Sequence, residues 1–244
     1  MTTKRHVLVV GGTRGIGRAF AQVCTERGWN VSLLARTAVH PVPDHTAYYS
    51  ADICAPSGVE RAIQAAADFF GPIHAAAFFQ RYRGGEDAWA GEWETSVKAT
   101  DTAVSAMLPS MAPSGDRSLV IVSSTAAQFV APEQNAAYHA SRAAQLGLMR
   151  YLAVLLGPRG IRVNCVSPGT VLKEENASFF GDDSEKRNRC TSVSALGRMG
   201  TALEVASAAE FLCSEKASWI TGQNLVCDGG ASLLWPESLH PKET

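Results

Sequence analysis

The sequence predicts an α/β protein whose single domain, residues 1–244, contains a doubly wound parallel sheet with helices on both faces. Three observations carry this prediction. Short apolar runs alternate along the chain with helical patterns of ten or more residues. A glycine-rich turn directly follows the first apolar run. No shift of composition marks a second domain, and no internal repeat is visible.

The first unit is the stretch VLVVGGTRGIGRAF, residues 7–20. Residues 7–10 predict a short buried strand, and a helical pattern begins at Arg18. The turn between them contains Gly11, Gly15 and Gly17. A strand, a glycine-rich turn and a helix start together predict a phosphate site, because the backbone can approach the ligand and the first helical amides face it. On these residues alone, an ordinary tight loop remains the alternative.

The other elements follow in order along the chain. Further strands are predicted at residues 31–35, 48–53, 73–79, 118–124, 161–166 and 223–227. Further helices are predicted at residues 59–70, 93–107, 136–156 and 203–213. The polar segment at residues 173–189, within a possible substrate lid at 171–195, is expected to be either a lid or a solvated surface loop.

Composition limits the function classes. Hydrophobic residues make up 46% and charged residues 18%, which excludes a disordered chain. The net charge of −1 argues against nucleic acid as the main partner. No apolar run long enough to span a membrane and no signal peptide are found, and six scattered cysteines suit a reducing compartment. We expect a cytoplasmic protein without a metal site, since the histidines lack ligand spacing.

Several motifs in order resemble the short-chain dehydrogenase/reductase family, of the β-ketoacyl-reductase-like kind. The resemblance runs nearly end to end and depends on residues 11–17, 52–53, 123–124, 138–142, 162–169, 196–200, 204–206, 211–214, 220–223 and 228–230. It implies a Rossmann-type fold and reversible hydride transfer between a nicotinamide cofactor and a carbonyl or alcohol. It also implies a homo-oligomer, a dimer or a tetramer, built on the helices at 93–107 and 136–156.

The predicted cofactor is NADP(H). Family members that use NAD carry an acidic residue where this chain has Ala35, and Arg36 stands beside it. Arg36 and Arg14 can both reach a 2′-phosphate, each with charge-assisted bonds of roughly 1.5–3 kcal/mol; two solvated arginines are the alternative. The resemblance implies a cofactor site of Gly11, Thr13, Arg14, Gly15, Ile16, Gly17, Arg36, Asp52, Ile53, Tyr138, Arg142, Pro168, Gly169 and Val171, with Asp52 near the adenine amino group.

The resemblance also assigns catalytic roles. Tyr138 is the expected proton donor to the carbonyl oxygen, and Ser124 is the hydroxyl that holds this oxygen. Ser124 lies one residue further from Tyr138 than is usual, so Ser123 and Thr125 stay open as alternatives. Arg142 follows Tyr138 by one helical turn and is the expected catalytic cation and ribose ligand.

Three positions depart from the family pattern. Arg142 replaces a lysine, Ser96 replaces an asparagine, and residues 78–81 replace an Asn-Asn-Ala-Gly motif. A fixed positive charge at about 4 Å contributes on the order of 1–4 kcal/mol, so an arginine can supply the charge. It is a poor proton donor, however, so a proton relay through it is doubtful.

We therefore expect an NADPH-dependent enzyme that reduces a ketone of a small, specialised-metabolite substrate to an alcohol. Two alternatives remain open. One is an NADP(H)-binding sensor or partner protein without catalysis, and the other is a dehydratase or isomerase on the same fold.

Overall fold

The computed structural model describes residues 4–37, 44–181 and 185–235 of the chain. Its main sheet has seven strands, all parallel, in the order β3-β2-β1-β4-β5-β6-β9. Their bounds are His6–Val10 (β1), Asn30–Ala35 (β2), Thr46–Ser50 (β3), Ala75–Phe78 (β4), Arg117–Val122 (β5), Ile161–Pro168 (β6) and Asn224–Cys227 (β9). The strand order reverses between β1 and β4, which confirms the predicted doubly wound sheet.

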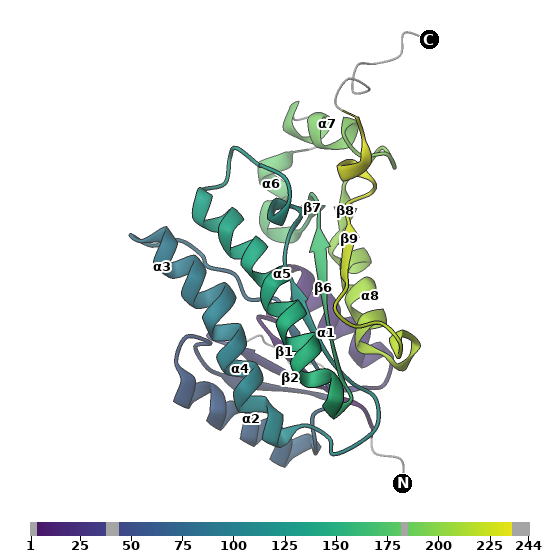
Figure 1. Ribbon diagram of the computed structural model, residues 1–244. Helices are drawn as coiled ribbons and strands as arrows, with labels where there is room; N and C mark the ends of the chain where they lie inside the picture. Colours follow the sequence, from purple (N-terminus) through teal and green to yellow (C-terminus); the bar gives the residue numbers. More distant parts are fainter. Residues whose placement is uncertain (1–3, 38–43, 182–184, 236–244) are drawn as a thin grey trace.

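Helices cover both faces of the sheet (Figure 1). The helices α2 (Pro56–Phe70), α4 (Ala99–Met107) and α5 (Ala136–Leu156) pack on one face, and α1 (Gly15–Glu26) and α8 (Ala202–Cys213) pack on the other. Strand side chains alternate between two apolar layers, because successive residues of a strand point to opposite faces. In β1, Leu8 and Val10 join the first layer, whereas Val7 and Val9 join the second.

Several predicted boundaries differ from the observed ones, and two of these differences have identifiable reasons. The third strand ends at Ser50 rather than at residue 53, because Asp52 forms a turn in which its Oδ1 accepts from the Cys54 amide at 3.0 Å. Ile53 is buried as a core residue outside the strand, so its hydrophobicity misled the prediction. The helix predicted from residue 93 begins earlier, as α3 (Ala88–Glu92), because the Asp87 carboxylate caps it by accepting from the Ala90 amide.

The segment that follows β6 contains regular structure. Strand β7 (Val171–Leu172) pairs with β8 (Gly200–Thr201), and the helices α6 (Ala177–Phe180) and α7 (Glu185–Ser192) lie between them. Residues 182–184 lie outside the described residues. The segment is therefore largely helical where it is described, and its role as a substrate lid stays a prediction.

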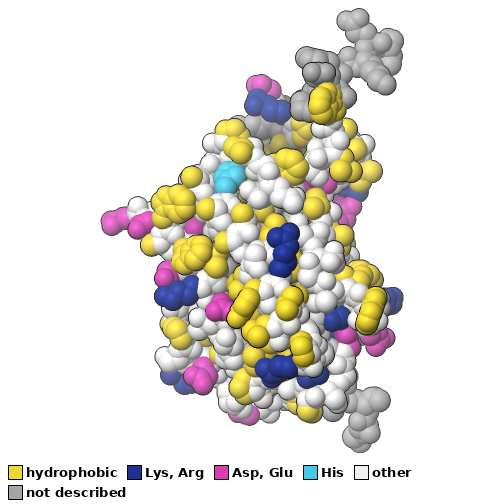
Figure 2. Space-filling model, in the orientation of Figure 1, with side chains coloured by type: hydrophobic (Ala, Val, Ile, Leu, Met, Phe, Trp, Pro, Cys, Tyr) yellow, Lys and Arg dark blue, Asp and Glu magenta, His cyan; other side chains and the backbone are white. Residues whose placement is uncertain are grey.

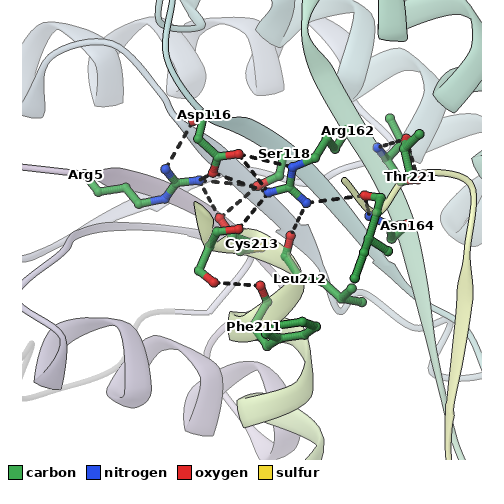
Figure 3. A network of polar contacts seen from close by, with 12 residues as sticks. Arg5, Asp116, Ser118, Arg162, Asn164, Phe211, Leu212, Cys213 and Thr221 are labelled. Atoms are coloured by element: carbon green, nitrogen blue, oxygen red, sulfur yellow. Dashed lines mark hydrogen bonds and ion pairs between the residues drawn. The ribbon is translucent and has the colours of Figure 1, made fainter. Parts of the chain in front are cut away.

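A cluster of arginine side chains and their partners lies at the amino end of the sheet (Figure 3). Asp116 accepts from Arg5 at 2.8 Å and from Arg162 at 3.0 Å. Arg162 also donates to the carbonyl oxygens of Leu212 (2.8 Å) and Ser214 (2.9 Å), at the carboxyl end of α8. Helix-end carbonyls lack partners within the helix, so these bonds satisfy them and fix α8 to β6.

Candidate functional site

Two adjoining cavities lie at the carboxyl ends of the strands, where the strand order reverses. The larger has a volume of about 700 Å³ and the smaller about 280 Å³. Both are lined by Gly11, Arg14, Phe79, Gln80, Arg81 and Arg83. In open α/β sheets, ligands bind at this kind of crevice.

The glycine-rich turn forms the floor of the crevice. Gly11 has φ of +78°, and a Cβ there would lie 2.7 Å from the backbone nitrogen of Gln80. A Cβ at Gly17 would lie 2.5 Å from the carbonyl oxygen of Gly11. The close packing brings the start of α1 against the crevice. The N-cap residue Arg14 makes no side-chain bond to the first amides of α1, which leaves these amides available to an anion.

The larger cavity holds the residues predicted to contact the adenosine half of a cofactor. Its lining includes Thr13, Arg14, Arg36, Asp52 and Ile53. Arg14 and Arg36 are both exposed, and within the described ranges neither forms an ion pair. Two uncompensated guanidinium groups therefore border this cavity.

The smaller cavity brings together the predicted catalytic residues and the remaining cofactor residues. Its lining includes Gly15, Ile16, Gly17, Ser124, Tyr138, Arg142, Pro168, Gly169 and Val171. Of the three alternative hydroxyls, Ser123 donates to the carbonyl oxygen of Arg142 at 2.9 Å, and Thr125 is not part of the lining. Ser124 lines the cavity and accepts from the Ala126 amide at 3.1 Å, so its hydroxyl proton stays available.

Arg142 points away from solvent into a polar cluster between α3 and α5. Its side chain is 3% exposed, and its guanidinium donates to Gln145 Oε1 (3.1 Å), Ser96 Oγ (3.3 Å) and Glu92 Oε2 (3.4 Å). The Nε atom is buried and has no hydrogen-bond partner there. The guanidinium carbon lies 4.7 Å from the centre of the Tyr138 ring. Burial lowers the pKa of Arg142, and the nearby Tyr138 and Glu92 act in the opposite direction.

Glu92 is the site residue that the sequence interpretation missed. Its carboxylate is buried, and Oε2 accepts from the hydroxyls of Ser96 and Ser141 at 3.2 Å each, in addition to Arg142. Glu92 precedes Ser96 by four residues, one helical turn, and this spacing was the available signal. A buried charge requires a partner, and the pairing compensates the charge of Arg142.

Ser96 lies in a π-helical turn, Trp93–Lys98, between α3 and α4. Such turns release a backbone carbonyl from the regular helical pattern and are frequent at functional sites. The Ser96 carbonyl accepts from Gln145 Nε2 at 3.1 Å and from Thr100 Oγ1 at 2.9 Å. The Gln145 side chain therefore places an amide in the cluster that Ser96 itself lacks.

The segment after β4 and the segment after β7 form opposite walls of the smaller cavity. Arg81 lies over the Tyr138 ring, with 5.4 Å from its guanidinium carbon to the ring centre. Arg83 pairs with Glu175 at 3.9 Å. The Glu175 carboxylate lies against Gly15, since a Cβ there would be 2.9 Å from Oε1. Desolvation lowers the pKa of Lys173 beside it, partly opposed by Glu175.

The aromatic residues of this region divide between core and cavity. Phe78 is buried in the core, and Phe79 and Tyr82 line the larger cavity. Phe79 also packs against Phe20, with 5.1 Å between ring centres. Trp89 is 61% exposed and borders neither cavity.

His139, the neighbour of Tyr138, has a structural role. Its Nε2 accepts from the Ala131 amide at 2.9 Å, and its Nδ1 lies 2.9 Å from the Asn135 carbonyl oxygen. Within the described ranges, no three His, Cys, Asp or Glu side chains are grouped to bind a metal ion. In the same part of the chain, no helix has the length and apolar character needed to cross a membrane.

Known proteins are similar to this chain over nearly its whole length. A family model described as enoyl-(acyl carrier protein) reductase matches residues 10–232. The chain is 28% identical to an A-factor type gamma-butyrolactone 1′-reductase (1S-forming) of Streptomyces virginiae, over 96% of this chain and 98% of the relative. It is 31% identical to the isoepoxydon dehydrogenase patN of Penicillium expansum, over 92% of this chain and 93% of the relative.

A solved structure of another protein has the same fold. The ligand-free aldohexose dehydrogenase of Thermoplasma acidophilum superimposes with a TM-score of 0.84 at 29% identity, covering 98% of both chains. The family model and this agreement along the whole length lead to one conclusion. The chain belongs to the short-chain dehydrogenase/reductase family, oxidoreductases that act on carbonyl and alcohol groups with NAD(P)(H).

Proposed function

We propose that this protein is an NADPH-dependent reductase that converts a ketone of a small molecule into an alcohol, within one domain that spans residues 1–244. The observation that carries the proposal is the smaller cavity, in which Ser124, Tyr138 and Arg142 meet the glycine-rich turn. The dehydrogenase and reductase names of the relatives support the reaction class.

The residues present fit a dinucleotide. The floor of the crevice at Gly11 and Gly17 has no room for a Cβ, and the first amides of α1 are uncapped. Arg14 and Arg36 fit the 2′-phosphate, while Asp52 and Ile53 fit the adenine. When bound, the nicotinamide supplies the hydride.

The chain itself supplies the proton and the binding of the oxygen. Ser124 donates its hydroxyl proton in a hydrogen bond to the substrate carbonyl oxygen, and this bond strengthens as negative charge develops there. Tyr138 then transfers its phenolic proton to that oxygen. Arg142, fixed by Glu92, Ser96 and Gln145, holds the Tyr138 ring in position.

A second candidate function is NADP(H) binding without turnover. One observation favours it: the Arg142 guanidinium, at the position of the family lysine, is engaged by Glu92, Ser96 and Gln145. An arginine in such a cluster relays protons poorly. After Tyr138 has given up its proton, it would then regain one only slowly through the Arg142 side chain.

We also propose that the protein forms a homo-oligomer through the face made by α5 and the π-helical turn. Hydrophobic side chains gather over this face (Figure 2). Tyr151, Val154, Leu155 and Trp93 are each more than half exposed there. Exposed apolar patches of this kind commonly mark contacts between subunits.

The test is a fluorescence titration of the purified protein with NADPH and NADH, followed by NADPH consumption with ketones and quinones. We expect tighter binding of NADPH, and turnover with at least one carbonyl compound. Arg36→Ala should reduce the NADPH/NADH affinity ratio by about tenfold or more, because it removes a charge-assisted bond. Tight binding without any turnover would favour the second candidate. An unchanged ratio in Arg36→Ala would contradict the assignment of NADPH.

A further inference from the structure

Two guanidinium groups lie on the ring of Tyr138, and they come from different parts of the chain. Arg142 belongs to α5, like Tyr138 itself, at 4.7 Å from the ring centre. Arg81 comes from the segment after β4, at 5.4 Å. The two differ in how far neighbouring groups compensate their charge.

The charge of Arg142 is compensated inside the protein. Its guanidinium contacts the Glu92 carboxylate at 3.4 Å, and both side chains are at most 5% exposed. A pair of opposite charges at this distance acts on a third group as a dipole, which is weaker than a single charge. Arg142 has a hydrogen bond with the Tyr138 side chain, but its pairing with Glu92 weakens its effect on a negative charge that develops there.

The charge of Arg81 has no such compensation. Within the described residues, Arg81 is exposed and forms no ion pair, and Glu175, an acid that lines the same cavity, pairs with Arg83 at 3.9 Å. The other titratable group against the ring is His139, whose ring centre lies 6.0 Å away and whose two nitrogens face backbone groups. Arg81 is thus the unpaired cation in contact with Tyr138.

We propose that Arg81 supplies the positive charge that stabilises Tyr138 as it gives up its proton, a role that the family pattern gives to a lysine at position 142. In this step the phenolic O–H bond breaks, the proton goes to the substrate carbonyl oxygen, and the electron pair stays on the Tyr138 oxygen. Arg81 acts through Tyr138 and is not itself a proton donor. The inference rests on the proposed function of Tyr138.

The expected size of the effect follows from Coulomb's law. A unit charge at about 5 Å changes the ionisation midpoint of a neighbouring group by between roughly half a pH unit and two pH units, depending on the local dielectric. Because Arg81 is exposed and solvent screens its charge, removal of Arg81 should move the ionisation of Tyr138 to higher pH by about half a unit, the lower end of this range.

The experiment is an ultraviolet titration of tyrosinate in the intact protein, which requires neither substrate nor turnover. The protein has five tyrosines, so the signal of Tyr138 is obtained as the difference from Tyr138→Phe. Arg81→Gln should raise the midpoint of this difference by about half a pH unit, and Arg81→Lys should restore most of the shift. Arg61→Gln is the matched control, because Arg61 is exposed on α2 outside both cavities.

The outcomes separate the inference from the proposed function. An unchanged midpoint in Arg81→Gln, or an equal shift in Arg61→Gln, overturns the inference even if Tyr138→Phe is inactive. A weaker apparent binding of ketones with an unchanged midpoint also overturns it, since this would assign Arg81 to substrate binding. Full turnover by Tyr138→Phe contradicts the proposed function instead, whatever the titration shows.

Discussion

Two arginine–carboxylate clusters lie at opposite ends of the same parallel strands. At the amino end, every guanidinium nitrogen of Arg162 donates to Asp116 or to a carbonyl oxygen near the end of α8 (Figure 3). At the carboxyl end, Arg142 contacts Glu92 but keeps one buried nitrogen, Nε, without a partner. Of the two clusters, only the second lines either of the two cavities described above.

The difference separates a structural cluster from a functional one. Each cluster contains one buried Nε without a partner, that of Arg5 at the amino end and that of Arg142 at the carboxyl end. The amino-end cluster joins β1, β5, β6 and α8 and lines neither cavity, so we assign it a structural role. An incompletely satisfied arginine beside a cavity and next to a tyrosine is poised for interaction with a further group. If this comparison is correct, mutations at the amino end change stability, whereas mutations at the carboxyl end change activity as well.

Tyr138→Phe should give the largest effect. Removal of the phenolic hydroxyl removes the proton donor, so we expect turnover to fall by roughly 10²–10⁴-fold while NADPH still binds. The free energy of unfolding should change little, because Arg142, the hydrogen-bond partner of the Tyr138 side chain, keeps its bonds to Glu92, Ser96 and Gln145. Steady-state rates, cofactor titration and urea unfolding check the three parts. Turnover retained in Tyr138→Phe would contradict the functional role assigned to the carboxyl-end cluster.

Arg162→Ala should give the largest loss of stability. It leaves the carbonyl groups at the end of α8 without partners, and Asp116 keeps only Arg5. We expect a decrease of about 3 kcal/mol in the free energy of unfolding, measured with urea. The activity per folded molecule should stay within about twofold of the wild type. A large specific loss of activity would show that the amino end is not merely structural.

Glu92→Gln should affect both the stability and the activity of the protein. The amide keeps the shape of the side chain but leaves the buried Arg142 charge unpaired, which should cost about 2 kcal/mol of stability. The freed charge of Arg142 should also shift the pH dependence of turnover in the direction opposite to Arg81→Gln. Glu92→Gln combined with Arg142→Met, which removes both charges, should recover much of the stability without recovering activity. Loss of stability alone would place Glu92 with the structural cluster.

The amino end should also show a pH dependence of stability through His6. Its Nδ1 donates to the Gly71 carbonyl, so its Nε2 accepts from the Ser32 hydroxyl, and burial lowers the pKa of His6 to about 4. The unfolded chain, with a His pKa near 6.5, then binds more protons between these two values, so stability falls as the pH is lowered from 6.5 towards 4.

Through His6, the free energy of unfolding should decrease by about 2 kcal/mol between pH 7 and pH 5. His74, whose pKa burial also lowers, acts in the same direction. The measurement is therefore the difference in pH slope between the wild type and His6→Gln in urea unfolding. Equal slopes would show that His6 does not contribute.

Local patterns in the sequence determined most of the fold. The apolar run and glycine turn of residues 7–17 predicted the strand β1 and the turn that leads into α1, and the bounds of α5 were predicted to the residue. These features depend on periods of two or 3.6 residues and on turn chemistry, all within a few residues of one another. The predicted cofactor and catalytic residues line the two cavities, although their roles stay predictions.

The tertiary structure alone decided which partners these residues have. Glu92 and Arg142 are 50 residues apart, and Arg81 and Tyr138 are 57 apart, so no local period relates them. Their contacts follow from the packing of α3 and the segment after β4 against α5. The sequence by itself identified the tyrosine and the arginine. Only the packing decided that one arginine is paired with a buried carboxylate and that another lies unpaired over the same ring.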